Sequence, residues 1–279
     1  MNYKPVVKFP SNLKIIILII TIMLFTNIFG ALSIVITKEL GLDIGANYIQ
    51  GISQLFVLLG LTILLTNIIP LKVSTLFRLE NNIKVKYLLV GIIGLIFLNL
   101  FNNGYVSLQE YLIPEFLMPD YYEHKNWIQN LYNSMLKGDG VFDMSIALVI
   151  GALIPAISEE LLFRGVGLRA LEERNSPLFS ILIISLVFGL LHFNFINLIP
   201  LITIGIFLGA LAYYSKNIII PIFIHILNNA FSILMMYLDS NTTELTTINQ
   251  ISVLESLGLL TLGLAGITLS VIILSRFEN

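Results

Sequence analysis

Two adjacent glutamates and an arginine follow one of the most apolar stretches of the chain. The run IALVIGALIPAI occupies 146–157, and Glu159, Glu160 and Arg164 come within the next seven residues. A charged side chain at the centre of a bilayer costs about 2.5–3.5 kcal/mol on insertion scales, so a residue kept there is expected to have a function or a partner. These three charges are therefore the first place to look for chemistry.

The two glutamates cannot share the same surroundings if this stretch is a helix. Consecutive residues on an α-helix point about 100° apart. Glu160 and Arg164 are four residues apart and share one face, where an ion pair is the natural arrangement. A charged pair in a medium of low dielectric constant is tolerated when it is matched and hydrogen-bonded. Glu159 is left without a partner on its own helix, and we predict that it faces another helix.

His192 is the predicted partner of Glu159. A turn between two helices is expected at residues 175–177, because Asn-Ser-Pro contains turn-forming residues and a proline that favours the first turn of a helix. Glu159 lies 16 residues before Asn175, and His192 lies 17 residues after it. In an antiparallel hairpin both side chains then lie at one depth, about 24 Å from the turn at 1.5 Å per residue.

A later apolar segment contributes a second histidine. His225 and Asn229 are four residues apart and so share one helix face, as do Phe188 and His192. If the helix that carries Glu159 runs about 10 Å beyond the membrane surface, these polar residues converge near one level in the cytoplasmic half of the bilayer.

This set of side chains predicts a hydrolase. A carboxylate and an imidazole that face each other can hold and deprotonate a water molecule, here between Glu159 and His192. His225 and Asn229 supply hydrogen-bond donors for a developing oxyanion. The expected reaction is attack of water on a carbonyl, most simply that of a peptide bond.

Other interpretations stay open at this level. Zinc accepts the ligand types of Glu159, His192 and His225 with one open position, although the HExxH spacing is absent. Glu159 would also suit the proton or cation site of a transporter, although the chain shows no internal symmetry of the transporter kind. A non-catalytic scaffold for partner membrane proteins is the third alternative. Taken singly, His225 and Asn229 are explained as well by hydrogen bonds between helices, and Phe188 by core packing.

The composition defines the elements that must position these residues. Of the 279 residues, 57% are hydrophobic and 11% are charged, and the mean hydropathy is +0.91. These values are typical of a polytopic membrane protein, which in this case must be helical. The net charge of −2 argues against a nucleic-acid partner, and the absence of cysteine excludes disulfides and thiolate chemistry.

Apolar runs long enough to cross a bilayer predict an all-α bundle of about eight transmembrane helices. The expected spans are 13–37, 49–69, 87–106, 143–163, 178–195, 197–214, 218–238 and 251–275. We expect one membrane domain in three parts. These are N-terminal helices with an external amphipathic loop in 1–140, the core helices in 141–240 and a last helix in 241–279.

The distribution of basic residues predicts the orientation in the cell membrane. With the N-terminus in the cytoplasm, eleven lysines and arginines fall on the cytoplasmic side and three on the outer side, Arg164 left aside. This asymmetry follows the positive-inside rule and makes both termini cytoplasmic. The longest loop, about 107–142, is then external and rich in aromatic residues. We expect an interfacial amphipathic segment there, with a substrate lid as the alternative.

Read in order, three motifs resemble those of the CPBP family of intramembrane proteases. EELLFR at 159–164 fits the pattern EExxxR, FGLLH at 188–192 fits FxxxH, and HILNN at 225–229 fits HxxxN. The family, also called Abi, includes the type II CAAX prenyl endopeptidases and the lysostaphin-resistance-protein-A-like proteins. The resemblance covers about 150–240.

The resemblance implies an eight-helix membrane fold whose site opens toward the cytoplasmic side. It also implies endopeptidase activity on a membrane-associated peptide or protein. The roles it assigns are water activation by Glu159 and His192, an oxyanion hole from His225 and Asn229, and support of the site by Glu160, Arg164 and Phe188. Family members have been classed as metalloendopeptidases, but we expect no metal cofactor here, with zinc as the alternative.

The composition, rich in Ile, Asn and Lys, suggests an AT-rich bacterial genome. Prenylated CAAX substrates are not expected in bacteria. Bacterial relatives are linked to bacteriocin self-immunity or to the processing of peptides, and we expect a role of this kind.

Overall fold

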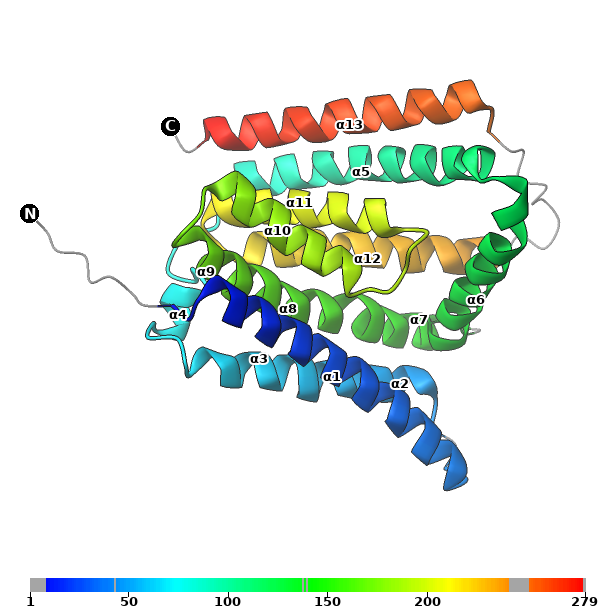
Figure 1. The fold of residues 1–279 in the computed structure, drawn as a ribbon, viewed down its shortest axis with the longest axis horizontal. Helices are drawn as coiled ribbons and strands as arrows, with labels where there is room; N and C mark the ends of the chain where they lie inside the picture. Colours follow the sequence, from blue (N-terminus) through cyan, green and yellow to red (C-terminus); the bar gives the residue numbers. More distant parts are fainter. Residues whose placement is uncertain (1–8, 43, 137, 139, 241–250, 278–279) are drawn as a thin grey trace, which may run out of the picture.

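The protein is all-helical in the computed structural model, which describes residues 9–42, 44–136, 138, 140–240 and 251–277 (Figure 1). No strand occurs within these ranges. Seven of the helices described there are long and apolar enough to cross a membrane. The predicted polytopic α-helical bundle is therefore confirmed.

The long helices run roughly side by side across the molecule (Figure 1). In chain order they are α1 (Asn12–Glu39), the continuous helix Ala46–Thr66, α5 (Val85–Leu112), the continuous helix Val141–Glu172, α11 (Leu198–Ser215), α12 (Ile219–Ser240) and α13 (Val253–Arg276). Ala46–Thr66 consists of α2 (Ala46–Ile52), the π-helical η1 (Ser53–Leu58) and α3 (Leu59–Thr66).

Val141–Glu172 also contains π-helical turns. Its parts are α7 (Val141–Leu148), the π-helical η3 (Val149–Leu153), α8 (Ile154–Glu160), the π-helical η4 (Leu161–Leu168) and α9 (Arg169–Glu172). The shorter elements are α4 (Val73–Leu76), the 3₁₀ turn η2 (Glu115–Leu117), α6 (Met118–Leu136) and α10 (Pro177–Leu190).

The predicted span 178–195 is wrong in length. Its helix, α10, ends at Leu190 after 14 residues, or about 21 Å, whereas the hydrocarbon core of a bilayer is about 30 Å thick. The chain turns at residues 191–193, and Phe193 has a left-handed φ of 52° that an α-helix cannot contain. This early end places His192 in the turn that follows α10, where it is half-buried.

The C-terminal helix α13 packs closely along α5. Gly263 of α13 lies so near α5 that a Cβ there would meet the backbone nitrogen of Phe101 at 2.4 Å. Gly104 of α5 approaches the backbone of Leu260 in the same way, at 2.5 Å. Small residues at such points let helix backbones touch, which is how helices associate in membranes. The predicted helix after residue 251 is therefore part of the bundle.

The segment 107–142, predicted as an amphipathic external piece, contains the helix α6 across one end of the bundle (Figure 1). Lys125 of α6 forms an ion pair with Glu110 near the end of α5. The hydroxyl of Tyr121 also donates to the side-chain oxygen of Gln109 at 3.3 Å. These two contacts attach α6 to α5.

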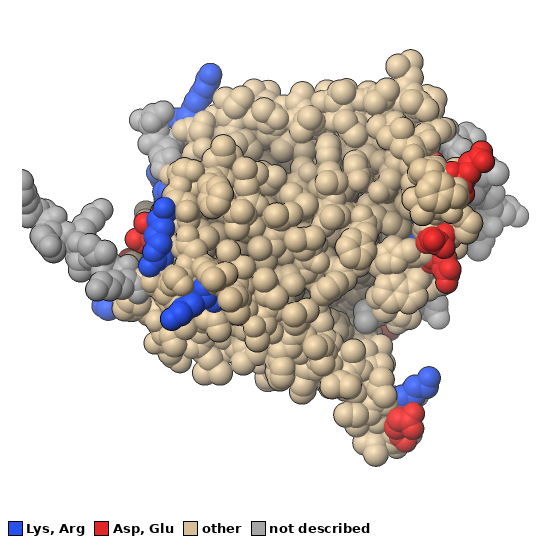
Figure 2. Space-filling model, viewed as in Figure 1, with Lys and Arg blue, Asp and Glu red and all other residues tan. Residues whose placement is uncertain are grey.

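Charged side chains gather at the two ends of the bundle (Figure 2). On the face shown, lysines and arginines cluster at the end where α1 begins and α13 ends, and the broad middle is almost without charge. An uncharged band between two polar ends is what a membrane-spanning bundle requires.

Candidate active site

The polar residues predicted within the membrane meet in the interior of the bundle. Glu159 and Glu160 are the last two residues of α8, and Arg164 lies in the π-helical turn that follows. His192 lies in the turn that follows α10, and His225 in the second turn of α12. Single π-helical turns inside α-helices are frequent at functional sites, and the sequence periodicity gave no sign of this one.

Glu160 holds the centre of the cluster. Its Oε1 accepts from Nη1 of Arg164 at 2.7 Å, and the side chains of both residues are fully buried. Nη2 of Arg164 donates to the backbone oxygen of Gly205 on α11 at 2.9 Å. The predicted pair of Glu160 and Arg164 is therefore present, and it also ties the α8 helix to α11.

The same Glu160 oxygen also lies 2.9 Å from Nδ1 of His225. Since a carboxylate accepts hydrogen bonds, Nδ1 of this histidine carries the proton. Sequence spacing did not indicate this bond, because spacing within one helix cannot show which of two histidines on other helices reaches a given glutamate. Glu160 thus orients the second histidine as well as neutralising Arg164.

Glu159 faces both histidines, as its separation from Glu160 on the helix predicted. Its Oε2 lies 3.9 Å from Nε2 of His192 and 4.0 Å from Nε2 of His225. Only 6% of Glu159 is exposed. These separations are too long for direct hydrogen bonds, and a water molecule placed between the groups could bridge them.

The ring orientation of His192 is fixed by its own helix. Nδ1 of His192 lies 2.7 Å from the backbone oxygen of Phe188. A carbonyl oxygen only accepts, so Nδ1 carries the proton and Nε2 of the neutral ring has a free lone pair. That lone pair is on the atom nearest to Glu159.

Phe188 packs against Arg164 and both histidines of the cluster. The guanidinium carbon of Arg164 lies 4.7 Å from the centroid of its ring. The ring also packs against His192 at 4.5 Å and His225 at 6.0 Å, centroid to centroid. Phe163 closes the far side edge-on at 5.1 Å. Phe188 is 1% exposed, so the cluster packs around a fully buried ring.

Asn229 is placed one turn beyond His225 on α12. It is half-buried, and its Oδ1 accepts from Nδ2 of Asn228 at 3.3 Å. Among the described hydrogen bonds, none joins Asn229 to Glu159 or to either histidine. Among these hydrogen bonds its side-chain nitrogen donates in none, so this nitrogen is available to a bound molecule.

A residue that the sequence did not indicate comes from α6. Desolvation raises the pKa of Tyr132, a side-chain hydrogen bond with Asn194 lowers it, and the negative charge of Glu159 raises it. Asn194 is itself buried in the turn that follows His192. The helix α6 thus reaches the turn that carries part of the site, which motif spacing could not reveal.

The arrangement does not match a zinc centre as it stands. Two ligands of a tetrahedral zinc ion, each about 2.0–2.1 Å from the metal, lie about 3.3 Å apart. The separations of Glu159 from His192 and from His225 are 3.9 and 4.0 Å. Within the part of the chain that is described, no three His, Cys, Asp or Glu side chains are grouped closely enough to hold a metal. We therefore derive no step through a metal.

Fold and site together define a multi-pass membrane protein with a buried carboxylate–histidine cluster in its core. The profile of the family described as type II CAAX prenyl endopeptidase Rce1-like matches residues 142–231. That segment contains the three motifs and all seven site residues predicted from them, which are Glu159, Glu160, Arg164, Phe188, His192, His225 and Asn229. The predicted resemblance to the CPBP family is confirmed over this segment.

A curated relative matches as well. YdiL of Bacillus subtilis (strain 168), whose name describes it as a candidate membrane peptidase, is 28% identical over 116 residues. The match covers 39% of this chain and 48% of YdiL, so the chain spans about half the length of the relative that it matches. No solved structure gives a significant match.

Proposed function

We propose that the protein is a membrane-embedded endopeptidase that hydrolyses a peptide bond of a membrane-associated peptide or protein. The observation that carries this proposal is the position of Glu159, a buried carboxylate 3.9 and 4.0 Å from the Nε2 atoms of two histidines. Glu160 is already paired with Arg164, so Glu159 is the carboxylate left for chemistry.

The reaction begins with a water molecule held between Glu159 and His192. Glu159 takes one proton of the water, and the oxygen attacks the carbonyl carbon of the scissile bond. The lone pair on Nε2 of His192 accepts the other hydrogen and orients the water. The tetrahedral intermediate then collapses, the carbon–nitrogen bond breaks, and Glu159 returns its proton to the leaving nitrogen. One water and one peptide bond give one carboxyl and one amino group.

The oxyanion is stabilised by His225 and Asn229. With both glutamates ionised and Arg164 protonated, two negative charges and one positive charge leave the buried cluster at −1. A protonated His225 balances that charge, donates from Nδ1 to Glu160 and points its Nε2 proton into the site. Buried charges need such a partner. The side-chain amide of Asn229, one turn further along α12, supplies the second donor.

The proposed chemistry needs no metal. For the substrate, similarity to YdiL and to the type II CAAX prenyl endopeptidase family supports a membrane peptidase. We propose peptide processing or bacteriocin self-immunity in a bacterial membrane as its biological setting.

The variant Glu159→Gln is the sharpest test. It keeps the shape of the side chain and removes the base, so we expect peptide cleavage to fall at least 100-fold, as for loss of a general base. Membranes of cells that contain the wild type, Glu159→Gln or the control Glu123→Gln, which changes an exposed carboxylate on α6, would be compared by quantitative peptidomics.

Peptides that disappear with Glu159→Gln and persist with Glu123→Gln would name the substrate. Equal cleavage by Glu159→Gln and the wild type would refute the proposed role of Glu159. Cleavage by the purified wild type is expected to continue with a strong zinc chelator present. Loss of cleavage on chelation, restored by added zinc, would show that the site uses a metal.

A further inference from the structure

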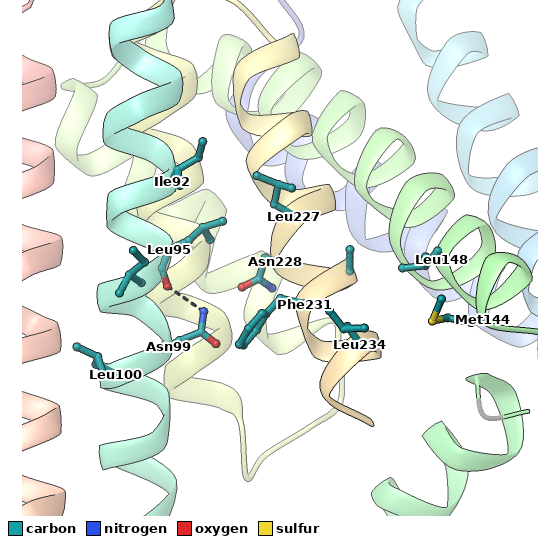
Figure 3. A pocket seen from close by; sticks show the side chains of 12 residues that line it. Ile92, Leu95, Asn99, Leu100, Met144, Leu148, Leu227, Asn228, Phe231 and Leu234 are labelled. Atoms are coloured by element: carbon teal, nitrogen blue, oxygen red, sulfur yellow. Dashed lines mark hydrogen bonds between the residues drawn. The ribbon is translucent and has the colours of Figure 1, made fainter. Parts of the chain in front are cut away.

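A groove lies beside the cluster, between α5, α7 and α12 (Figure 3). Its volume is about 670 Å³, within the range of pockets that hold ligands. Most of its lining side chains are apolar, among them Leu95, Met144, Leu148 and Leu234. Phe231 on its rim is 44% exposed, so the groove opens toward the lipid.

The groove adjoins the part of α12 that carries His225 and Asn229. Its wall on α12 includes Leu227 and Asn228, and His225 lies one turn or less away on the same helix. Nδ2 of Asn228 donates to Asn229, which we propose as an oxyanion donor. The groove wall and the proposed oxyanion donors therefore share one stretch of α12.

Two asparagines stand on opposite walls of this apolar groove. Asn99 of α5 and Asn228 of α12 both point into the space between their helices (Figure 3). Nδ2 of Asn99 donates to the backbone oxygen of Leu95 at 2.9 Å, and Nδ2 of Asn228 donates to Asn229. Among the described hydrogen bonds, neither side-chain oxygen accepts one. Both oxygens are thus open to a donor in the groove.

This polar pair decides what kind of molecule the groove suits. An amide oxygen without a donor is costly in hydrocarbon, and a lipid acyl chain has no donor to offer. A helical peptide uses its own backbone N–H groups internally. An extended peptide has free N–H groups for the two oxygens and apolar side chains for the walls.

We propose that the groove binds an extended, apolar segment of a polypeptide and passes it from the lipid to Glu159. The inference rests on the proposed function and names its substrate class as a membrane-embedded segment that unwinds before cleavage. On α5 the lining runs from Ile92 to Leu100, which is about 12 Å of helix and matches about four extended residues. The α5 wall lies outside the segment that matches the family.

The test uses photo-crosslinking in Glu159→Gln protein, where binding is measured without cleavage. Benzoylphenylalanine replaces Phe231 on the groove or, as the matched control, Phe223, which lies on the same helix, is 41% exposed and is not part of the lining. The peptide probe is a biotinylated, lysine-flanked segment of leucine and alanine with a central Gly-Pro. The lipid probe is a phosphatidylcholine with an alkyne on one acyl chain.

We expect at least fivefold more peptide adduct at position 231 than at 223. Asn99→Leu and Asn228→Leu should each lower the adduct at 231 about three- to tenfold, the loss of one hydrogen bond, and leave the lipid adduct unchanged. Equal peptide adducts at the two positions, or no effect of either asparagine variant, would overturn the proposal. So would a lipid adduct at 231 that outcompetes the peptide.

The comparison of positions 231 and 223 leaves both asparagines in place, so it stands even if an asparagine variant does not fold. Cross-linking reports binding alone. If the wild type cleaves no peptide but the groove still gives peptide adducts, the proposed protease activity is refuted and the proposed groove stands. If the wild type cleaves peptide but the groove gives no adducts, the proposed groove is refuted and the protease activity stands.

Discussion

At the level of single residues, the glutamate pair separates two tasks that one carboxylate could not perform together. Glu160 accepts hydrogen bonds from Arg164 and His225 through one oxygen, and it is therefore committed to holding the cluster together. Glu159, the next residue, has no direct hydrogen bond of this kind and faces two imidazole nitrogens. A helix turns by about 100° between neighbours, which gives adjacent carboxylates different surroundings without any loop.

The committed role of Glu160 leads to a prediction for stability. Arg164→Met removes the arginine that pairs with the buried Glu160, and breaking a buried pair from one side typically costs about 3–5 kcal/mol. The control Lys125→Met breaks the partly exposed pair with Glu110, for which about 0–1 kcal/mol is expected. Thermal unfolding in detergent micelles, followed by loss of the monodisperse peak, would rank the two variants.

A second variant shows whether charge or packing is responsible. Glu160→Gln combined with Arg164→Met removes both charges and should recover part of the lost stability. If Arg164→Met were no less stable than Lys125→Met, the central position of this ion pair in the fold would be contradicted.

Much of this residue pattern could be predicted from the sequence. The i, i+4 spacing indicated Glu160 with Arg164, and equal distances from the 175–177 turn indicated Glu159 with His192; the structure brings both sets together. The bond from Glu160 to His225 depends on how α12 is rotated about its axis, which side-chain packing decides. Contacts of this kind have no signal in spacing along one chain segment.

At the level of elements, the lengths of helices were less predictable than their existence. The apolar run 178–195 has the hydropathy of a span, yet α10 ends at Leu190. The end is produced by the turn through Phe193 and by Asn194, whose side chain accepts from the backbone of Asn197 at 3.2 Å. Hydropathy cannot distinguish an apolar helix from the apolar turn that follows it. The π-helical turn around Arg164 was not predicted either, because it leaves the i, i+4 pairing of Glu160 and Arg164 intact.

The close packing of α13 on α5 gives a prediction at this level. Gly263→Ala places a Cβ 2.4 Å from the backbone of Phe101, and overpacking of this kind costs about 1–3 kcal/mol. Gly258→Ala on the same helix is the matched control, since its Cβ would meet nothing within 4 Å. There a small stabilisation of about 0.4–1 kcal/mol is expected from the stiffer unfolded chain.

The two alanine variants would be compared by their melting temperatures in the same detergent. A lower melting temperature for Gly263→Ala and an unchanged or higher one for Gly258→Ala are expected. The same melting temperature for both would mean that α13 does not rest on α5 as closely as the structure places it.

At the level of the whole molecule, the candidate site has a groove on one side of the bundle and α6 across one end. The groove lies between α5, α7 and α12, and the buried cluster joins Glu159 of α8 to His192 after α10 and His225 of α12. Tyr132 of α6 is within the electrostatic reach of Glu159. A substrate that enters by the proposed groove would meet Asn99 and Asn228 before Glu159, the proposed base.

The orientation of the whole bundle is a prediction that the distribution of basic residues makes. The loop before α5, with Lys84, should be cytoplasmic, and α6 should lie on the outer side, because basic residues are retained on the cytoplasmic side during insertion. The chain has no cysteine, so single cysteines can be introduced without a background. Lys84→Cys and Glu123→Cys are suitable because both positions are exposed, one at each end of the bundle.

Labelling of intact cells with a membrane-impermeant maleimide would read the orientation directly. Glu123→Cys should react in intact cells, whereas Lys84→Cys should react only after the membrane is permeabilised. The reverse pattern would place α6 in the cytoplasm, and reaction of both in intact cells would put the two ends of α5 on one side of the membrane. Since Tyr132 connects α6 to the turn that carries His192, the label on α6 also shows from which side of the membrane this end of the site is covered.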